Sequence, residues 1–151
     1  MKVLIVGGGA GGATAAARLR RLDEKAEIII IERSGYISYA NCGLPYYIGG
    51  KITDREELTL QTPESFYSRF RIDARVRQEV VSIDTEMKCV NIRKLEDETE
   101  YVESFDKLIL SPGAHSVKPD LPGMNNERIF TLRTVEDTFQ IHDFVEKKQP
   151  K

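Results

Sequence analysis

The stretch KVLIVGGGAGG, residues 2–12, decides the fold. Its first five residues form a short apolar run, which is typical of a strand buried on both faces of a sheet. The glycine-rich part that follows matches the pattern G-x-G-x-x-G. Residues 13–22 are rich in alanine and carry apolar side chains on related turns, so they predict a helix. A strand, a glycine turn and a helix in this order are the start of a dinucleotide-binding unit.

Each glycine of the pattern has its own physical role. Gly7 permits the tight turn, Gly9 lets backbone N–H groups approach a pyrophosphate, and Gly12 lets the helix pack closely on the strand. Ala10 and Gly11 fill the remaining positions of the loop. The N-terminus of the helix adds unpaired N–H groups and a partial positive charge. We therefore expect this glycine loop to hold the phosphates of a dinucleotide.

An acidic residue follows at the expected distance. Residues 27–31, EIIII, predict a second buried strand, and this strand ends at Glu32. Glu32 lies about 20 residues past the last glycine, where a carboxylate accepts hydrogen bonds from a ribose. The pattern does not choose between FAD and NAD, and an NAD-dependent dehydrogenase domain would also carry it. A glycine-rich turn without a ligand is the remaining alternative.

Length and composition narrow the class of protein. One domain is the default for 151 residues, and 40% apolar with 30% charged residues is ordinary for a soluble globular protein. The net charge of −2 gives no electrostatic case for binding nucleic acid or an anionic membrane. The apolar runs fall far short of the ~20 residues that span a bilayer, and no signal peptide precedes the first strand. Two cysteines form no disulfide framework, so a cytoplasmic protein is expected.

The middle of the chain predicts one helix and an antiparallel meander. Thr62 is a candidate N-cap, Pro63 a first helical residue, and Phe70 the expected end of the helix. Alternating apolar residues then predict strands at 74–84, 88–94 and about 100–103. These strands form a β-meander over about 74–104, which we expect to be inserted in a parallel α/β unit.

A further buried strand is expected at Leu108–Leu110, followed by the glycine turn Ser111-Pro112-Gly113. Glycine turns at the carboxyl ends of central strands are where doubly wound sheets bind ligands. The predicted fold class is therefore α/β, a Rossmann-like domain with a parallel central sheet and an inserted antiparallel β-meander. Residues 119–123 indicate a linker, and TVED at 134–137 resembles a capping box that opens a last helix.

Cys42 lies in the run SYANCGLPYY, residues 38–47, downstream of the glycine loop. The thiolate is the reactive form of cysteine, and a short helix over 43–48 would favour it through its N-terminus. A small buried apolar residue is the alternative interpretation. Tyr46 and Tyr47 occupy the places where a C-x3-C or C-x4-C pair would put a second cysteine. A redox-active Cys42 would therefore use an external thiol, or cycle through a sulfenic or persulfide state.

The remaining candidate side chains are assigned no chemistry. Cys89 alternates with apolar neighbours in a predicted strand and is interpreted as structural. His115 and His142 lack the spacing of metal ligands, so no metal site is predicted. Both histidines are expected at the surface, with the alternative that His115, near a glycine turn, contacts the ligand.

Four motifs recur together in one known family. They are GGGAGGAT at 7–14, ER at 32–33, SYANCGLPY at 38–46 and KLILSPGA at 107–114. Together they resemble the single-cysteine branch of the FAD-dependent pyridine nucleotide-disulfide oxidoreductases. Within this branch the chain is most similar to the coenzyme A-disulfide reductases, including those fused to a rhodanese domain. The resemblance covers essentially the whole chain and implies a glutathione-reductase-like fold that is incomplete here.

The resemblance implies an FAD whose pyrophosphate lies over the glycine loop and whose flavin ring lies against Cys42. In this family NAD(P)H reduces the flavin, the flavin reduces the cysteine, and the thiolate attacks a disulfide or polysulfide. Cys42 is thus the implied catalytic residue. The implied cofactor-binding residues are Gly7, Gly9, Ala10, Gly11, Gly12, Glu32, Arg33, Asn41, Cys42, Val81, Ser111, Pro112 and Gly113.

Coenzyme A disulfide, coenzyme A persulfide or polysulfide is the substrate that the resemblance implies. The positions that match substrate contacts are Thr14, Arg18, Arg21, Ser38 and Asn41. Arg18, Arg20 and Arg21 can supply charge to the phosphates of coenzyme A, and a solvated helix face is the alternative. A further basic contact of the relatives falls here at Phe70, between Arg69 and Arg71.

The residue at position 10 distinguishes two groups of enzymes within this branch. The NADH oxidases and NADH peroxidases of this branch carry a histidine in the glycine loop, whereas this chain has Ala10. Acid–base assistance for a sulfenic acid cycle is then missing, which favours a disulfide or polysulfide reductase. A nucleotide-binding module without redox turnover is an alternative of a different class.

Family members are longer than this chain. We expect residues 1–114 to be the N-terminal portion of an FAD-binding domain, and 115–151 to be a linker and helix that lead to an NAD(P)H-binding domain. The resemblance implies a homodimer for the full-length protein, and we expect the 151 residues alone to be inactive.

Overall fold

The computed structural model describes residues 1–149. The chain forms two compact units. Met1–Tyr39 and Thr59–Gly113 make up the first unit, and Ala40–Leu58 packs with the chain from Ala114 onward in the second. The sequence places Ala40–Leu58 in one domain with the glycine loop, whereas the structure groups it with the C-terminal helix. No helix in the described range is long and apolar enough to cross a membrane.

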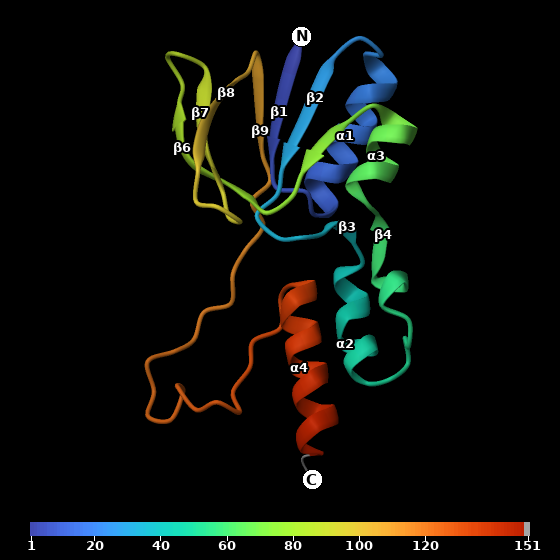
Figure 1. The fold of residues 1–151 in the computed structure, drawn as a ribbon, viewed down its shortest axis with the longest axis vertical. Coiled ribbons are helices and arrows are strands. Elements are labelled where there is room, and N and C mark those ends of the chain that lie inside the picture. Colours follow the sequence, from blue (N-terminus) through green and yellow to red (C-terminus); the bar gives the residue numbers. More distant parts are fainter. Residues whose placement is uncertain (150–151) are drawn as a thin grey trace. The chain divides into compact units, whose positions relative to one another are not determined.

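Most of the helices and strands belong to the first unit (Figure 1). They are β1 (Lys2–Val6), α1 (Ala10–Leu22), β2 (Glu27–Ile31), β3 (Ile37–Tyr39), β4 (Thr59–Gln61), α3 (Pro63–Phe70), β5 (Asp73–Arg75), β6 (Gln78–Asp84), β7 (Cys89–Lys94), β8 (Glu100–Ser104) and β9 (Lys107–Leu110). Up to residue 149, the second unit contains two 3-10 helices and two α-helices. They are η1 (Asn41–Gly43), α2 (Leu44–Ile48), η2 (Arg55–Leu58) and α4 (Val135–Lys148).

A parallel sheet with the order β5-β2-β1-β9 forms the centre of the first unit. β1 pairs with β2 from Lys2↔Glu27 to Val6↔Ile31, and with β9 along its other side. Because these strands run in one direction, the loops that follow β1, β2 and β9 emerge at the same edge of the sheet. This is the edge at which α/β folds bind ligands. The predicted α/β class and parallel central sheet are confirmed.

The central sheet is covered on both faces. Val3, Ile5 and Ile30 pack against α1 and α3 on one face, and Leu4 and Ile29 pack against the meander on the other. Figure 1 shows α1 and α3 on one side of the sheet and β6, β7 and β8 on the opposite side. These five side chains are at most 2% exposed. Burial on both faces is the reason why β1 and β2 are unbroken apolar runs.

The predicted strand at 74–84 is in fact two strands. Residues 73–75 form β5, which is the parallel neighbour of β2, whereas β6 starts at Gln78 in the meander. Between them Arg77 has a left-handed backbone with φ of 54°, which ends one strand and redirects the chain. The meander therefore spans 78–104, with antiparallel pairing in the order β6-β7-β8.

The helix after the glycine loop also differs from its predicted bounds. α1 begins at Ala10, not at residue 13, and Gly9 is its N-cap. Glycine has a low helix propensity, but packing of α1 on the sheet outweighs it here. The predicted starts of the two later helices are confirmed, because Thr62 and Thr134 each form a capping box.

An ion-pair network around Glu103 on β8 joins the meander to the central sheet. The carboxylate accepts hydrogen bonds from Lys2 Nζ at 2.5 Å and from Arg75 Nη1 at 2.6 Å. Arg75 also donates to the Tyr101 hydroxyl on the meander. Burial alone would raise the pKa of Glu103, but the hydrogen bonds from Lys2 and Arg75 outweigh it and hold this pKa below its usual 4.5. The network therefore favours the charged carboxylate in the folded protein.

Glu103→Gln is expected to lower the free energy of unfolding by about 1–3 kcal/mol at neutral pH, because Lys2 and Arg75 each lose one of their anionic partners. A carboxylate with a depressed pKa stabilises the fold fully above its unfolded-state pKa, and this contribution disappears as pH falls through the folded-state pKa. Urea unfolding of the two proteins should therefore give curves that converge in acid. If the two proteins differ in their free energy of unfolding by the same amount at neutral and acidic pH, the account is contradicted. The control is Glu96→Gln, a substitution of an exposed carboxylate that should change this free energy little.

Candidate functional site

The turn after β1 can be built only with glycine at two positions. Gly7 has a φ of 100°, and a Cβ there would lie 2.0 Å from the carbonyl oxygen of Ser111. A Cβ on Gly12 would lie 1.9 Å from the carbonyl oxygen of Gly7. Real Cβ atoms do not approach backbone oxygens so closely, so both positions exclude any side chain. The first turn of α1 thus lies in direct contact with the loop.

Gly9 is different, because no atom lies within 4 Å of the position that its Cβ would take. The space next to Gly9 is open, and a side chain there would fill it. α1 starts at the next residue without a side-chain cap and without an acidic residue in its first turn. Its first N–H groups are therefore available as donors at the positive end of the helix. Open space and free donors fit a pyrophosphate, which is the group that the sequence predicts here.

Glu32 is held against the glycine loop by backbone hydrogen bonds. Its Oε2 accepts from the N–H of Gly8 at 2.6 Å, and its Oε1 accepts from the N–H of Ser34 at 2.7 Å. An ionised carboxylate has about four acceptor sites, so two remain for the hydroxyl groups of a ribose. The N–H of Ser38 donates to the carbonyl of Gly8 at 2.8 Å and brings a predicted substrate residue to the same loop.

The other predicted cofactor residues of the first unit divide into two groups. Ser111 follows β9, and its N–H donates to Val6 at 2.8 Å, which places the SPG turn beside the glycine loop. Arg33 forms an exposed ion pair with Glu79 at 3.3 Å. Val81 is the extra residue of a β-bulge in β6, where it is 37% exposed. Neither Arg33 nor Val81 contacts the glycine loop through a hydrogen bond in the described residues.

Three predicted substrate residues lie on one exposed face of α1. Thr14, Arg18 and Arg21 are four and then three positions apart, which is the spacing of neighbours along a helix face. All three are exposed. Two arginines therefore line one side of α1 with their charges available to solvent.

Arg20 was expected to supply charge as well, and this expectation is wrong. Its guanidinium donates to four backbone carbonyls, those of Asp23, Glu24, Phe70 and Arg71. It joins the C-terminal ends of α1 and α3 and is a structural residue. At Phe70 the ring packs on Phe66, with centroids 5.5 Å apart, and the Arg69 guanidinium lies 5.2 Å from the Phe70 ring.

Asn41–Gly43, which we call the thiol turn, is the 3-10 helix η1 of the second unit. Cys42 is exposed, so the alternative of a buried apolar cysteine is wrong. Gly43 is buried, and Leu44 and Tyr47 anchor the following α2 with side chains at most 5% exposed. A fixed turn therefore presents Cys42 to solvent. Cys89 is half-buried in β7, in keeping with a structural role.

Two residues of the second unit have contacts that the sequence does not predict. Arg133 donates to the side-chain oxygen of Asn41 at 3.1 Å, although 92 positions separate the two. His142 was expected at the surface, but it is half-buried, and its ring lies 4.9 Å from that of Tyr47. Its Nδ1 is buried without a hydrogen-bond partner in the described residues. No local pattern marks either contact, since both depend on how α4 packs.

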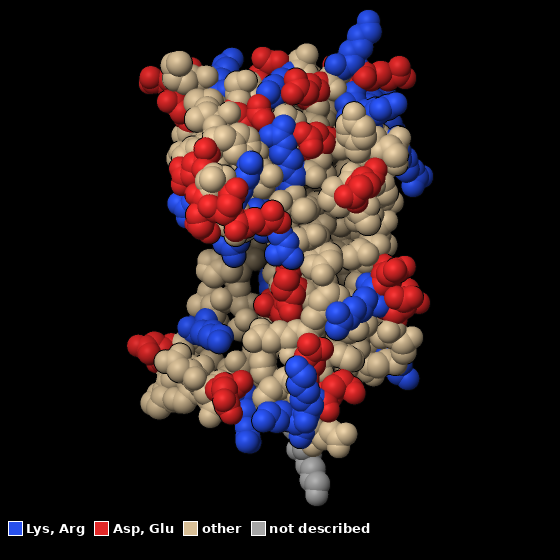
Figure 2. All heavy atoms as spheres, in the orientation of Figure 1, with Lys and Arg blue, Asp and Glu red and all other residues tan. Residues whose placement is uncertain are grey.

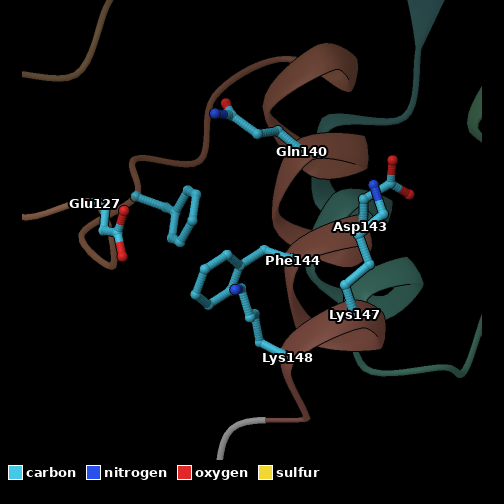
Figure 3. Close-up of a pocket in the computed structure, with 7 residues that line it drawn as sticks. Glu127, Gln140, Asp143, Phe144, Lys147 and Lys148 are labelled. Atoms are coloured by element: carbon cyan, nitrogen blue, oxygen red, sulfur yellow. The ribbon is translucent and has the colours of Figure 1, made fainter.

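A hollow beside α4 is separate from the predicted site residues (Figure 3). It lies between α4 and the preceding loop, and it is lined in part by Phe130 and Phe144, whose ring centroids are 5.0 Å apart. None of the predicted site residues lines it. In residues 1–149 no cluster of three or more side chains could hold a metal ion. Acidic and basic side chains are interspersed on the face shown in Figure 2, which offers no extended patch of one sign.

Comparison with known proteins assigns all of the described residues to one family. The family model of the pyridine nucleotide-disulphide oxidoreductases matches residues 1–149. The chain belongs to this family. FAD and a pyridine nucleotide are the cofactors of the family, and its members are oxidoreductases.

Several individual proteins of this kind are similar to the chain. The coenzyme A disulfide reductase of Staphylococcus aureus strain JH9 is 42% identical over 148 residues, which are 98% of this chain and 33% of that protein. The crystal structure of reduced Bacillus anthracis CoADR-RHD superposes with a TM-score of 0.96 at 51% identity, covering 99% of this chain and 27% of that one. An NAD-dependent persulfide reductase from A. fulgidus gives a TM-score of 0.91 at 33% identity, covering 97% and 27%. The chain thus spans about a third of the length of the curated relatives.

Gly9, the N-cap of α1, and Gly12, in its first turn, are expected to respond differently to substitution by alanine. Gly12→Ala should destabilise the protein by about 3 kcal/mol or more, because the new methyl group meets a backbone oxygen that cannot move away. Gly9→Ala should lower the free energy of unfolding by no more than about 1 kcal/mol, because its methyl group points into open space and only the N-cap preference for glycine over alanine is lost. Thermal or urea unfolding measures both. Equal destabilisation by the two variants would contradict the described loop.

Proposed function

We propose that this chain carries the FAD site and the reactive thiol of an NAD(P)H-dependent disulfide oxidoreductase. The observation that carries the proposal is Cys42, which a fixed turn presents to solvent in a chain that also has an open pyrophosphate loop. A module that only binds a nucleotide has no use for an exposed cysteine in this turn. Family membership supports the same assignment.

Gly7–Gly12 would hold the FAD pyrophosphate through backbone N–H groups, and Glu32 would accept hydrogen bonds from the adenosine ribose. Ser111 and Ser38, which hydrogen-bond to the strand and loop beside these residues, complete the same edge of the sheet. When bound, FAD supplies a route for two electrons from NAD(P)H to sulfur. The residues of this chain would bind the FAD and hold it in position.

Cys42 is proposed as the residue that reacts with the oxidised substrate. Its thiolate attacks one sulfur of a disulfide, so that a bond from Cys42 to that sulfur forms and the disulfide bond breaks. The released thiolate takes up a proton. The two electrons from NAD(P)H then reduce the bond at Cys42, release the second thiol and restore the cysteine. An exposed thiol suits this reaction, because the incoming disulfide must approach in line with the bond that breaks.

The substrate is proposed to be coenzyme A disulfide, coenzyme A persulfide or polysulfide. Two relatives of this chain are named as a coenzyme A disulfide reductase and a persulfide reductase. Thr14, Arg18 and Arg21 offer a hydroxyl group and two cations on one exposed helix face, which is suited to phosphate groups. Arg20 is excluded from this role by its carbonyl contacts.

An NADH oxidase or peroxidase is disfavoured by Ala10, which is exposed at the start of α1. A methyl group at this place cannot transfer a proton to or from an oxidised sulfur. The remaining hydrogen-bonding groups of the loop are backbone N–H groups, which suit phosphate binding.

Cys42→Ser in the whole protein is expected to reduce NAD(P)H-dependent reduction of coenzyme A disulfide by at least about 100-fold, because serine cannot form the mixed disulfide. The bound flavin, measured by its visible absorbance, should stay at the wild-type level. Cys89→Ser is the matched control and should keep both activity and flavin. Rates with coenzyme A disulfide, polysulfide, peroxide and oxygen are to be compared.

Retention of full disulfide reductase activity in Cys42→Ser would remove this cysteine from the reaction. A wild-type protein that reduces peroxide or oxygen much faster than any disulfide would instead favour the oxidase or peroxidase. A protein that binds nucleotide but oxidises no NAD(P)H with any of the four acceptors would be a binding module.

A further inference from the structure

Arg133, just before α4, makes three hydrogen bonds, and one of them reaches the thiol turn. Its Nη1 donates to Oδ1 of Asn41 at 3.1 Å, and its Nε donates to the carbonyl of Ala114 at 3.2 Å. Its own backbone N–H donates to the Asp137 carboxylate at 2.9 Å. Arg133 is therefore fixed at both ends, by the capping box of α4 and by the loop after Gly113.

These contacts determine which end of the Asn41 carboxamide faces Arg133. A guanidinium group has only donors, so it can pair with the amide oxygen of Asn41 and not with the amide nitrogen. The Nδ2 group is left pointing away from Arg133, and it has no protein partner within residues 1–149. Asn41 thus offers a free hydrogen-bond donor in the same helical turn as the exposed Cys42.

We propose that Arg133 is a positioning residue. It fixes the Asn41 carboxamide so that its N–H group can donate to the sulfur that departs when Cys42 reacts with a disulfide. The proposal rests on the proposed role of Cys42 and adds how the turn assists it. In thiol–disulfide exchange negative charge develops on the departing sulfur. A donor that is already oriented towards that charge stabilises it without having to reorganise.

A simple exchange reaction tests this step without flavin or NAD(P)H. The neutral reagent 4,4′-dithiodipyridine forms a mixed disulfide with Cys42, its own disulfide bond breaks, and the pyridinethiolate that leaves takes up a proton and absorbs light as the thione. All proteins carry Cys89→Ser, which leaves Cys42 as the one cysteine of residues 1–151. Cys42→Ser in the same background gives the rate of any other thiol, and this rate is subtracted. The variants are Arg133→Met, Arg133→Lys, Asn41→Ala and the double variant with Arg133→Met and Asn41→Ala.

Arg133→Met and Asn41→Ala are each expected to slow the exchange by about three- to tenfold, the effect of one lost hydrogen bond of ordinary strength. The double variant should be no slower than Asn41→Ala alone, because Arg133 acts only through Asn41. Arg133→Lys keeps a donor and should restore at least about half of the rate. Exposed Arg128→Met is the matched control and should leave the rate unchanged.

An Arg133→Met rate within about twofold of the wild type, or effects that multiply in the double variant, would overturn the proposal. Thermal unfolding is measured for every variant. If Arg133→Met does not fold, Arg133→Ala takes its place, because it also removes the donors to Asn41 without placing a charge beside Cys42 and must also slow the exchange. The outcome is independent of the proposed enzyme activity, because a wild-type exchange rate can be measured whether or not the whole protein oxidises NAD(P)H.

Discussion

The contact between Gly12 and the carbonyl oxygen of Gly7 is the constraint on which the rest of the first unit depends. The backbone of α1 lies so close to the turn after β1 that a single methyl group would collide at 1.9 Å. This closeness lets α1 lie flat on the sheet and bury Ala13 and Ala16. α1 begins at the residue after Gly9, so its first N–H groups lie next to the open space beside Gly9. One steric requirement thus produces both the fold of this unit and the anion site proposed for it.

The central sheet depends on the helices that cover one of its faces and on the meander that covers the other. Alternate side chains of β1 and β2 point to the helices and to the meander, and neither set is left to solvent. The meander contributes Val90 and Ile92, both completely buried, to this second layer. Glu103 then links the two layers through Lys2 and Arg75. The edge of the sheet with the glycine loop is held in place by packing on both sides.

The sequence predicts those elements whose signals lie in a few neighbouring residues. The glycine pattern, the apolar runs of β1 and β2, and the capping boxes at Thr62 and Thr134 are local signals, and the structure has these elements where they are expected. The break at Arg77 is not signalled, because left-handed arginine has no characteristic pattern. It becomes clear only when β5 is seen to pair with β2.

Long-range polar contacts are the part of the candidate site that the sequence does not reveal. Arg18, Arg20 and Arg21 look alike in the sequence, yet only Arg20 reaches the carbonyls at the end of α3. Arg133 meets Asn41 across 92 positions because both lie in the second unit. Such contacts are set by the packing of whole elements, which no window of neighbouring residues contains.

The most direct measurement of the central claim compares FAD with riboflavin. Riboflavin carries the same ring but lacks the pyrophosphate and the adenosine, so it cannot use the N–H groups of the glycine loop. Calorimetric titration of the whole protein, freed of flavin, should show FAD bound at least about 100-fold more tightly than riboflavin. Equal affinity for the two ligands would contradict the account, because the glycine loop would then contribute nothing to binding.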